Sequence, residues 1–327
     1  MGKYYLSLDI GGTKTSAAVF DENGNIKKNY VYTTKSVTDQ GKEKVYENTR
    51  NAVNSTLRAL GMDKKDLKGI GVGAPGPLNV KKGEIIHAPL MNWTNFPLVK
   101  RLCEDYGIPV CLENDGNLGA LAENMCGRAV GKRDVIYITV STGIGGGFVH
   151  CGQIYHGSGD GALEAGHITV FPSGLKCPCG SVGCLELYAS GTAITKKIRD
   201  DMKEGKIKSI AFEMAGYDER LLNSKVLYEA ALKNDKYAQD IFRSAGEYLG
   251  IGIGILFTLF DPDVLVIGGG VSKASKFFIE NLMYEARQHS INPIRNEQIQ
   301  ISDLCDRVVL YGAYYLIKNY LKKEDGI

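Results

Sequence analysis

Residues 4–20 read YYLSLDIGGTKTSAAVF, and residues 135–150 read VIYITVSTGIGGGFVH. In both stretches a run of apolar and β-branched residues meets a glycine turn, and a second run follows. Such runs, bounded by glycine, predict two β-strands joined by a tight turn. Two copies of one pattern predict an internally duplicated α/β protein, with one copy at the start of each half.

The remaining elements follow from periodicity. We expect strands at Ile70–Gly73, Val110–Leu112 and Val264–Ile267, and helices at Val45–Leu60, Glu113–Cys126, Tyr237–Phe260 and Tyr311–Lys322. The predicted domains are a small α/β domain at 1–117 and a large α/β domain at 118–307. We expect the last helix, about 308–327, to pack back on the small domain.

Composition excludes several classes of protein. The chain has 327 residues, more than one core of about 100 to 150 residues holds, and 44% are hydrophobic, as in globular proteins. A net charge of +2 gives no field that favours nucleic acid or an anionic membrane. The N-terminus has no signal-peptide pattern, and the apolar run Leu249–Phe260 is too short to span a bilayer. We therefore expect a cytoplasmic protein whose cysteines are reduced.

The two glycine turns are candidate phosphate sites. Glycine allows backbone N–H groups to approach phosphate oxygens, and Thr13 adds a hydroxyl donor. Either turn alone is equally typical of a plain hairpin, but the repetition favours a nucleotide site. The sequence has no Gly-Lys-Ser/Thr P-loop, and Gly71–Gly76 matches G-x-G-x-x-G only formally, because prolines stand where a helix should begin.

Glu113, Asn114 and Asp115 follow a short apolar strand and precede a helix. All three are residue types that cap helices, and this is the default interpretation. A carboxylate at the carboxyl end of a strand is also where a general base for a hydroxyl nucleophile can stand. Both interpretations stay open.

A cluster of metal-ligating residue types lies within residues 167–184: His167, Cys177, Cys179 and Cys184. Three thiolates and one imidazole are typical of a closed, structural zinc site. The alternative is reduced cysteines on an exposed loop. Glu164 and Glu186 flank the cluster and could accept hydrogen bonds from substrate hydroxyls. The other histidines, His87, His150, His156 and His289, have no partner at a readable spacing and are interpreted as surface or turn residues.

Taken together, these motifs resemble the ROK family of sugar kinases, and within it the bacterial glucokinases. The resemblance rests on 8–14, 73–77, 113–117, 141–147, 164–167, 177–186, 189–194 and 267–271, in family order over nearly the whole chain. It implies a two-domain actin-like ATPase (ribonuclease H-like) fold with an interdomain cleft. It also implies ATP with Mg²⁺ as phosphoryl donor, a hexose 6-hydroxyl as acceptor, a structural Zn²⁺ and a homodimer.

The resemblance assigns roles to residues of this chain. Asp115 is implied as the general base, and the implied sugar-binding residues are Gly76, Asn114, Asp115, Glu164, His167 and Glu186. The implied cofactor-binding residues are Asp9, Gly11, Gly12, Thr13, Lys14, Thr142, Gly143, Gly269 and Gly270. Two departures bear on the sugar: the order Leu90-Met91-Asn92-Trp93 and Gly116 in place of a more usual alanine.

Three functions are weighed. The first is an ATP-dependent glucokinase, and the second is a kinase of N-acetylmannosamine, N-acetylglucosamine or allose on the same fold. The third is a sugar-sensing repressor, because the family includes repressors with a helix-turn-helix domain ahead of the first glycine motif. Only three residues precede Tyr4 and basic residues are not in surplus, so we expect no nucleic-acid binding.

Overall fold

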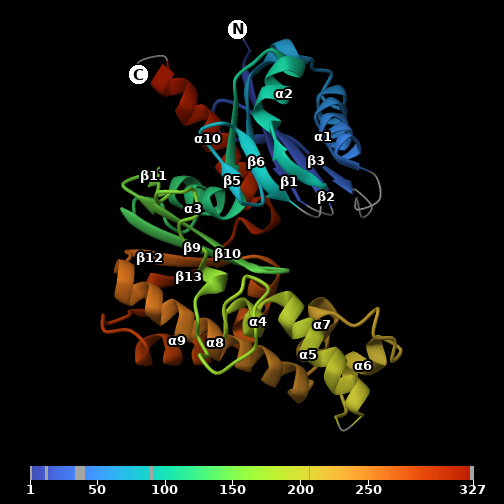
Figure 1. Cartoon of the computed structure of the whole chain (residues 1–327), viewed down its shortest axis with the longest axis vertical. Helices are drawn as coiled ribbons and strands as arrows, with labels where there is room; N and C mark the ends of the chain where they lie inside the picture. The colour runs from blue at the N-terminus through green and yellow to red at the C-terminus, as the bar shows by residue number, and fades with distance from the viewer. Residues whose placement is uncertain (1, 12–13, 34–40, 89–90, 206, 325–327) are drawn as a thin grey trace. The chain divides into compact units, whose positions relative to one another are not determined.

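The computed structural model describes residues 2–11, 14–33, 41–88, 91–205 and 207–324. The chain folds into two compact units (Figure 1). The first comprises Met1–Gly131, Gly147–Ala162 and Arg307–Ile327, and the second comprises Lys132–Gly146 and Leu163–Asp306. These units group residues differently from the domains 1–117 and 118–307, which stay a prediction. Within the described ranges, no helix is both long and apolar enough to cross a membrane.

The first sheet has the strand order β3-β2-β1-β4-β8. Its strands are β1 (Tyr4–Ile10), β2 (Lys14–Phe20), β3 (Ile26–Thr33), β4 (Leu67–Ala74) and β8 (Val110–Asn114). Strands β1, β2 and β3 form an antiparallel meander, whereas β1, β4 and β8 run parallel. A small sheet is formed by β5 (Leu78–Asn79), β6 (Glu84–Ala88) and β7 (Trp93–Phe96).

Helices cover both faces of the first sheet. They are α1 (Gly41–Arg58), α2 (Leu98–Tyr106), α3 (Asp115–Cys126) and α10 (Val308–Glu324). Alternate residues of β1 face opposite sides: Leu6 and Leu8 join the core under α1 and α2, and Tyr5 packs with Tyr314 of α10. Helix α10 lies against α3, β4 and β1 (Figure 1).

Strand β4 explains the false dinucleotide motif. Ile70 and Val72 are fully buried, and Gly71 and Gly73 alternate with them. A β-carbon on Gly71 would lie 1.9 Å from the carbonyl oxygen of Ala313 in α10. The glycines are therefore needed for close packing of α10 on the sheet, and not for contact with a pyrophosphate.

The second sheet repeats the order of the first, as β11-β10-β9-β12-β13. Its strands are β9 (Asp134–Val140), β10 (Ile144–His150), β11 (Gln153–Ile154), β12 (Val264–Gly268) and β13 (Ile299–Ile301). The helices of the second unit are α4 (Glu186–Ala189), α5 (Gly191–Glu204), α6 (Ile210–Met214), α7 (Ser224–Leu232), α8 (Lys236–Phe260) and α9 (Ile279–Gln288). The repeated strand order agrees with the duplication predicted from the two glycine motifs.

Candidate active site

Polar residues of the first unit gather at the carboxyl ends of its parallel strands. Asp9 on β1 pairs with Gly73 on β4, and Ala74 pairs with Asn114 at the end of β8. The carboxyl ends of parallel strands are where α/β proteins bind ligands. Asp9, Asn114 and the following Asp115 thus lie along one edge of the sheet.

Strand β8 continues two residues further than expected, through Glu113 and Asn114, and α3 begins at Asp115. The expected helix start at Glu113 is wrong because Asn114 keeps an extended backbone and caps the helix. Its Oδ1 accepts hydrogen bonds from the backbone N–H groups of Gly116 at 2.8 Å and Asn117 at 3.4 Å. The cap interpretation is therefore confirmed for Asn114.

Asp115 stands in the first turn of α3 and is half-buried. Its Oδ1 accepts a hydrogen bond of 2.8 Å from the N–H of Gly116. The loop after β4 comes close to the same segment, because a β-carbon on Gly76 would lie 3.4 Å from Nδ2 of Asn114. Gly76 and Asn114, predicted to hold the sugar, are therefore neighbours, and Asp115 follows directly.

The first glycine turn is described in part. The N–H of Gly11 donates to the carbonyl oxygen of Lys14 at 2.9 Å, and the side chain of Lys14 is exposed. Gly12 and Thr13, both predicted to contact phosphate, lie outside the described residues.

The second glycine turn borders a cavity of about 700 Å³ at the N-terminal end of α5. Ser190 caps this helix, and the N–H groups of Gly191 and Thr192 donate to the carbonyl oxygens of Ser141 and Thr142. The turn is thus held against the start of the helix, where the positive end of the helix dipole favours an anion. Of the predicted cofactor residues, Thr142 and Gly270 line this cavity.

Sequence reasoning missed the residues that α5 adds to the cavity. They follow Thr192 at helical spacing: Thr195, Lys196, Arg199 and Lys203. Intervals of three and four residues place side chains on one face of a helix, so this spacing in the sequence could have identified them as a group. Their charges are partly balanced, since Lys196 pairs with Asp200 at 2.5 Å and Lys203 pairs with Glu219 at 2.6 Å.

Gly269 and Gly270 follow β12 and differ in their surroundings. Gly269 has φ +85°, and a β-carbon there would lie 2.4 Å from the carbonyl oxygen of Val140. Around Gly270 a β-carbon would meet no atom of the described chain within 4 Å. Gly269 is therefore required by the backbone, whereas Gly270 leaves space open beside the cavity.

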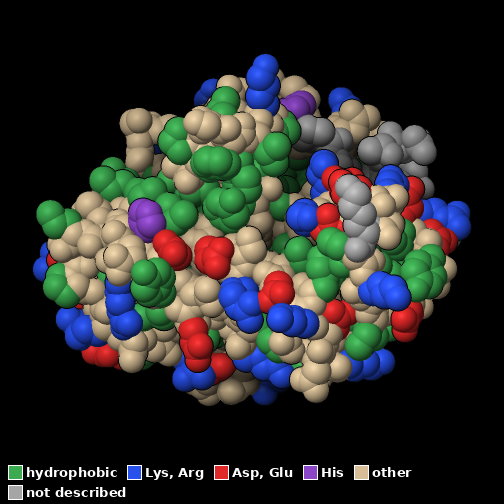
Figure 2. Space-filling model, turned by 90° about the horizontal axis from the view of Figure 1, so that it is seen from below, with side chains coloured by type: hydrophobic (Ala, Val, Ile, Leu, Met, Phe, Trp, Pro, Cys, Tyr) green, Lys and Arg blue, Asp and Glu red, His purple; other side chains and the backbone are tan. Residues whose placement is uncertain are grey.

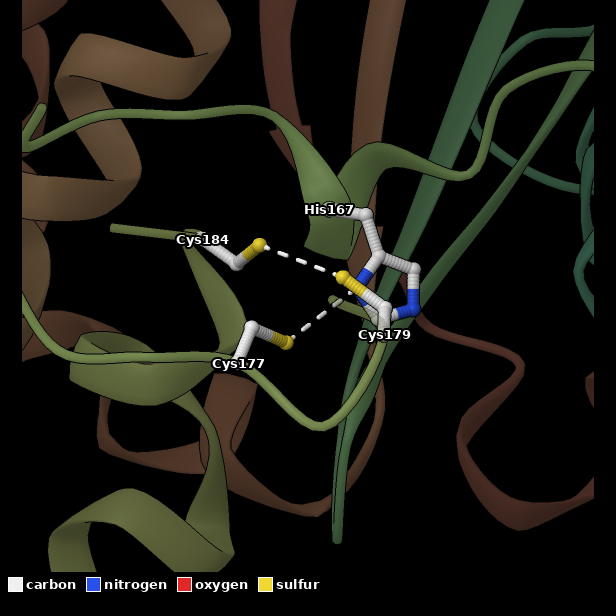
Figure 3. A group of neighbouring side chains, drawn as sticks. All are labelled: His167, Cys177, Cys179 and Cys184. Carbon is white, nitrogen blue, oxygen red and sulfur yellow. Dashed lines mark hydrogen bonds between the residues drawn. The ribbon is translucent and has the colours of Figure 1, made fainter. Parts of the chain in front are cut away.

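The predicted metal cluster is assembled in the structure (Figure 3). The ligand atoms of His167, Cys177, Cys179 and Cys184 all lie within 4.8 Å of one another. Sγ of Cys179 is 3.7 Å from Sγ of Cys184, and Sγ of Cys177 is 3.8 Å from Nδ1 of His167. Zn–S bonds of about 2.3 Å at tetrahedral angles place sulfur atoms about 3.8 Å apart, so the donor set fits zinc.

The pKa shifts of two of the cysteines are also those expected of a cluster that binds a cation. The N–H of Ser181 lowers the pKa of the Cys179 thiol. Burial and the neighbouring thiols raise the pKa of Cys184 to about 12. Thiolates crowded in this way repel one another, and a divalent cation is the group that makes their joint ionisation favourable.

The cluster ties two carboxylate-bearing turns together. His167 ends the 3₁₀ turn Ala165–His167, which Glu164 precedes, and Cys184 stands two residues before Glu186 at the start of α4. The N–H of Leu185 donates to the carbonyl oxygen of Ile168 at 2.9 Å. Glu164 and His167 are exposed and Glu186 is half-buried, so the loop fixes the backbone from which all three side chains extend.

Glu186 also touches the second glycine turn. Its Oε2 accepts a hydrogen bond of 2.9 Å from the N–H of Ile144, and a β-carbon on Gly143 would lie 2.4 Å from that same oxygen. A residue predicted to bind the sugar thus contacts a turn predicted to bind phosphate.

His156 has a partner that its position in the sequence did not reveal. Its Nε2 lies 2.7 Å from Oε2 of Glu113, whose side chain is 1% exposed. The pair links residues 43 positions apart, and no local sequence signal indicated it.

Comparison with known proteins gives a consistent result. The ROK family model matches residues 5–320. A glucokinase of Halalkalibacterium halodurans is 33% identical over 97% of this chain and 95% of its own length. A xylose repressor of Caldicellulosiruptor bescii is 28% identical over 91% of this chain and 72% of its own length. The crystal structure of a ROK family glucokinase from Streptomyces griseus, in complex with glucose and AMPPNP, has a TM-score of 0.82 at 32% identity and covers 96% of this chain and 98% of that one.

Proposed function

The chain belongs to the ROK family, and on this premise we propose that it is an ATP-dependent glucokinase that phosphorylates the 6-hydroxyl of glucose. The likeness to the Streptomyces griseus enzyme confirms the predicted actin-like ATPase fold, while the interdomain cleft stays a prediction. The observation that carries the proposal is the Asn114–Asp115 pair at the carboxyl end of β8, beside Gly76.

In the proposed mechanism Asp115 accepts the proton of the 6-hydroxyl as that oxygen attacks the γ-phosphorus of ATP, the bond from the γ-phosphorus to the β–γ bridging oxygen breaks, and ADP leaves. Asn114, Glu164, His167 and Glu186 hold the other sugar hydroxyls. Phosphoryl transfer needs a positioned nucleophile, a base and neutralised phosphate charge, and little covalent work from the protein. A base adds about 10²- to 10⁴-fold, and positioning supplies the larger share.

We assign the cavity beside α5 to the nucleotide. It lies at the positive end of the α5 dipole, its cations Lys196 and Arg199 suit a polyphosphate, and its volume of about 700 Å³ lies within the usual range for ligand sites. Thr142 and Gly143 are proposed to contact phosphate, and Gly269 and Gly270 the adenosine. Asp9, Gly11 and Lys14, with Gly12 and Thr13 outside the described residues, are proposed for the phosphates and Mg²⁺. When bound, Mg²⁺ neutralises phosphate charge, and carboxylates such as Asp9 are its preferred protein ligands.

Two alternatives are kept. The same fold could select N-acetylmannosamine, N-acetylglucosamine or allose, since the stretch at Leu90 departs from the family pattern. The chain is also similar to repressors, as the xylose repressor shows. A coupled ADP-release assay over a hexose panel separates these: glucose kinase activity favours the proposal, a preference for another hexose favours the second function, and no turnover with any hexose contradicts both kinases.

We also propose a cytoplasmic homodimer. Exposed apolar side chains of the second unit include Leu259, Tyr284 and Ile291. Figure 2 shows one face of the molecule, where apolar side chains gather in one part and acidic and basic side chains are interspersed elsewhere. Light scattering in solution measures the oligomeric state.

Gly270→Val tests the nucleotide assignment. A β-carbon at Gly270 would meet no described atom within 4 Å, and the new side chain would extend beside the proposed adenosine site. We expect the KM for ATP to rise about tenfold or more, with the KM for glucose and the Tm unchanged. Gly159→Val in the first unit, where a β-carbon also meets no described atom within 4 Å, is the control and should change none of these. An unaltered KM for ATP would remove Gly270 from the site.

Gly143→Ala is expected to act on the sugar as well as on ATP. The new β-carbon displaces the carboxylate of Glu186, which is the flexible end of a side chain, so the fold tolerates the change. Losing one charged hydrogen bond to glucose should raise its KM about tenfold. Gly145→Ala, on the strand β10 that follows the turn, is the control, because its β-carbon would lie 3.4 Å from Cγ2 of Thr139, an ordinary contact. An effect confined to ATP would show that Glu186 does not hold the sugar.

A further inference from the structure

The carboxylate of Glu113 is buried within the first unit, directly before the Asn114–Asp115 pair. Its side chain is 1% exposed, and both of its oxygens are hydrogen-bonded. Oε1 accepts from the N–H of Asn114 at 2.8 Å and from Nδ2 of Asn117 at 2.9 Å, and Oε2 faces Nε2 of His156 at 2.7 Å. Burying an ionised carboxylate costs free energy unless another group pairs with it. His156, which can carry a positive charge, is such a partner for Glu113.

The hydrogen bonds of Glu113 reach the segment that carries the proposed base. One holds the peptide N–H of Asn114, and the other holds the side chain of Asn117 in the first turn of α3. The same turn is capped by Oδ1 of Asn114. Asp115 lies between these fixed points, so its backbone position follows from them.

We propose that His156 is a positioning residue for phosphoryl transfer, acting through Glu113 on the Asn114–Asp115 segment. The inference rests on the proposed kinase function, because it assigns a task to the segment that carries the base. Phosphoryl transfer requires that the base is already held in position, since a misplacement of about 1 Å can lower the rate about 10²-fold. Neither ATP nor glucose needs to touch His156.

The pair is accessible to protons. Both side chains line a cavity of about 820 Å³ in the first unit. The hydrogen bond to Glu113 raises the pKa of His156, burial opposes the shift, Asp160 adds to it and Lys81 opposes it. His156 is thus protonated and forms an ionic pair with Glu113 below the usual histidine pKa of about 6.5. The pair loses its positive charge as the pH rises through the raised pKa of His156. Above that value a neutral imidazole can still donate from Nε2 to Glu113.

The test compares His156→Gln, which keeps a donor at the reach of Nε2, with His156→Leu, which removes it. His87→Leu, at an exposed histidine of β6, is the matched control. We expect kcat to fall about 10- to 100-fold in His156→Leu, about threefold or less in His156→Gln, and not at all in the control. The ratio of wild-type to His156→Gln kcat should approach one as the pH rises, because only the wild-type pair loses charge.

Glu113→Gln completes a double-mutant cycle. If His156 acts through Glu113, adding His156→Leu to Glu113→Gln should lower kcat by less than about threefold further. Hydrogen exchange of the peptide covering 110–118 provides a readout that needs no turnover: exchange should rise in His156→Leu and stay low in His156→Gln. If His156→Leu does not fold, the ratio of wild-type to His156→Gln kcat decides the question: a ratio that does not change with pH contradicts the inference.

Several results would overturn the inference. They are additive losses in the cycle, equal losses in the Leu and Gln variants, or unchanged kcat and exchange in His156→Leu. If the wild-type protein does not phosphorylate glucose, the proposed function fails, and the exchange measurement then decides by itself whether His156 orders the segment.

Discussion

Asp115→Asn is expected to lower kcat by about 10²- to 10⁴-fold with saturating glucose and ATP, while the Tm stays within a few degrees of the wild type. The amide cannot take the proton of the 6-hydroxyl. The asparagine side chain retains an oxygen at the Oδ1 position, which in Asp115 accepts a hydrogen bond from the N–H of Gly116. In addition, the main cap of α3 is the side chain of Asn114, which the substitution does not change. Folding should therefore survive, and calorimetry should still detect glucose binding.

Asp235→Asn is the matched control for this variant. Asp235 caps α8 and accepts hydrogen bonds from Ser209 Oγ and from the N–H groups of Ile210 and Ala238. Asp235 is buried, so losing one of these hydrogen bonds should cost about 1 kcal/mol or more of folding free energy and leave kcat per folded molecule unchanged. If Asp115→Asn keeps more than about a tenth of wild-type turnover, Asp115 is not the base and serves only the helix start.

The local parts of the fold were predictable because short-range chemistry determines them. Apolar runs ending in glycine, such as Tyr4–Ile10, identified strands, and the duplicated pattern predicted the repeated strand order. The residues of the metal cluster were predictable because all four ligand types lie within residues 167–184. The helix boundary at Asp115 was missed by two residues, since Glu113, Asn114 and Asp115 are all residue types that cap helices and the pattern does not reveal which of them stays extended.

Long-range contacts were not predictable in this way. His156 and Glu113 are 43 residues apart, and their pairing depends on how the loop after β11 lies beside the end of β8. Gly71 is explained only by α10, more than two hundred residues later, whose carbonyl oxygen at Ala313 would meet a β-carbon there. Such positions are determined by tertiary packing, which overrides local propensity.

Cys179→Ser is expected to remove zinc and to weaken glucose binding together. Cys179 is exposed, so the substitution should be tolerated in folding, but a hydroxyl is a poor ligand beside two thiolates and an imidazole. We expect elemental analysis to give about one zinc per wild-type chain and much less in the variant. Glucose affinity should fall about 10- to 100-fold, the range typical when residues that orient a site are lost.

The linkage follows from the loop itself. Cys184 stands two residues before Glu186, His167 three residues after Glu164, and the N–H of Val170 donates to the carbonyl oxygen of Gly183 at 2.9 Å. Gly183 has φ +73°, and a β-carbon there would lie 1.8 Å from the carbonyl oxygen of Phe171, so this turn is built for glycine. Without the ion the two turns keep only their backbone hydrogen bonds, and the backbone that carries both carboxylates is held less firmly.

Cys305→Ser is the control, because Cys305 is also exposed in the second unit and lies outside the cluster. It should retain zinc, glucose affinity and turnover. ATP binding should respond little in Cys179→Ser, since the cavity beside α5 contains none of the four ligands. Active wild-type enzyme without zinc would eliminate the metal site. If the zinc-free variant binds glucose normally, the ion contributes only to stability and does not position Glu164 and Glu186.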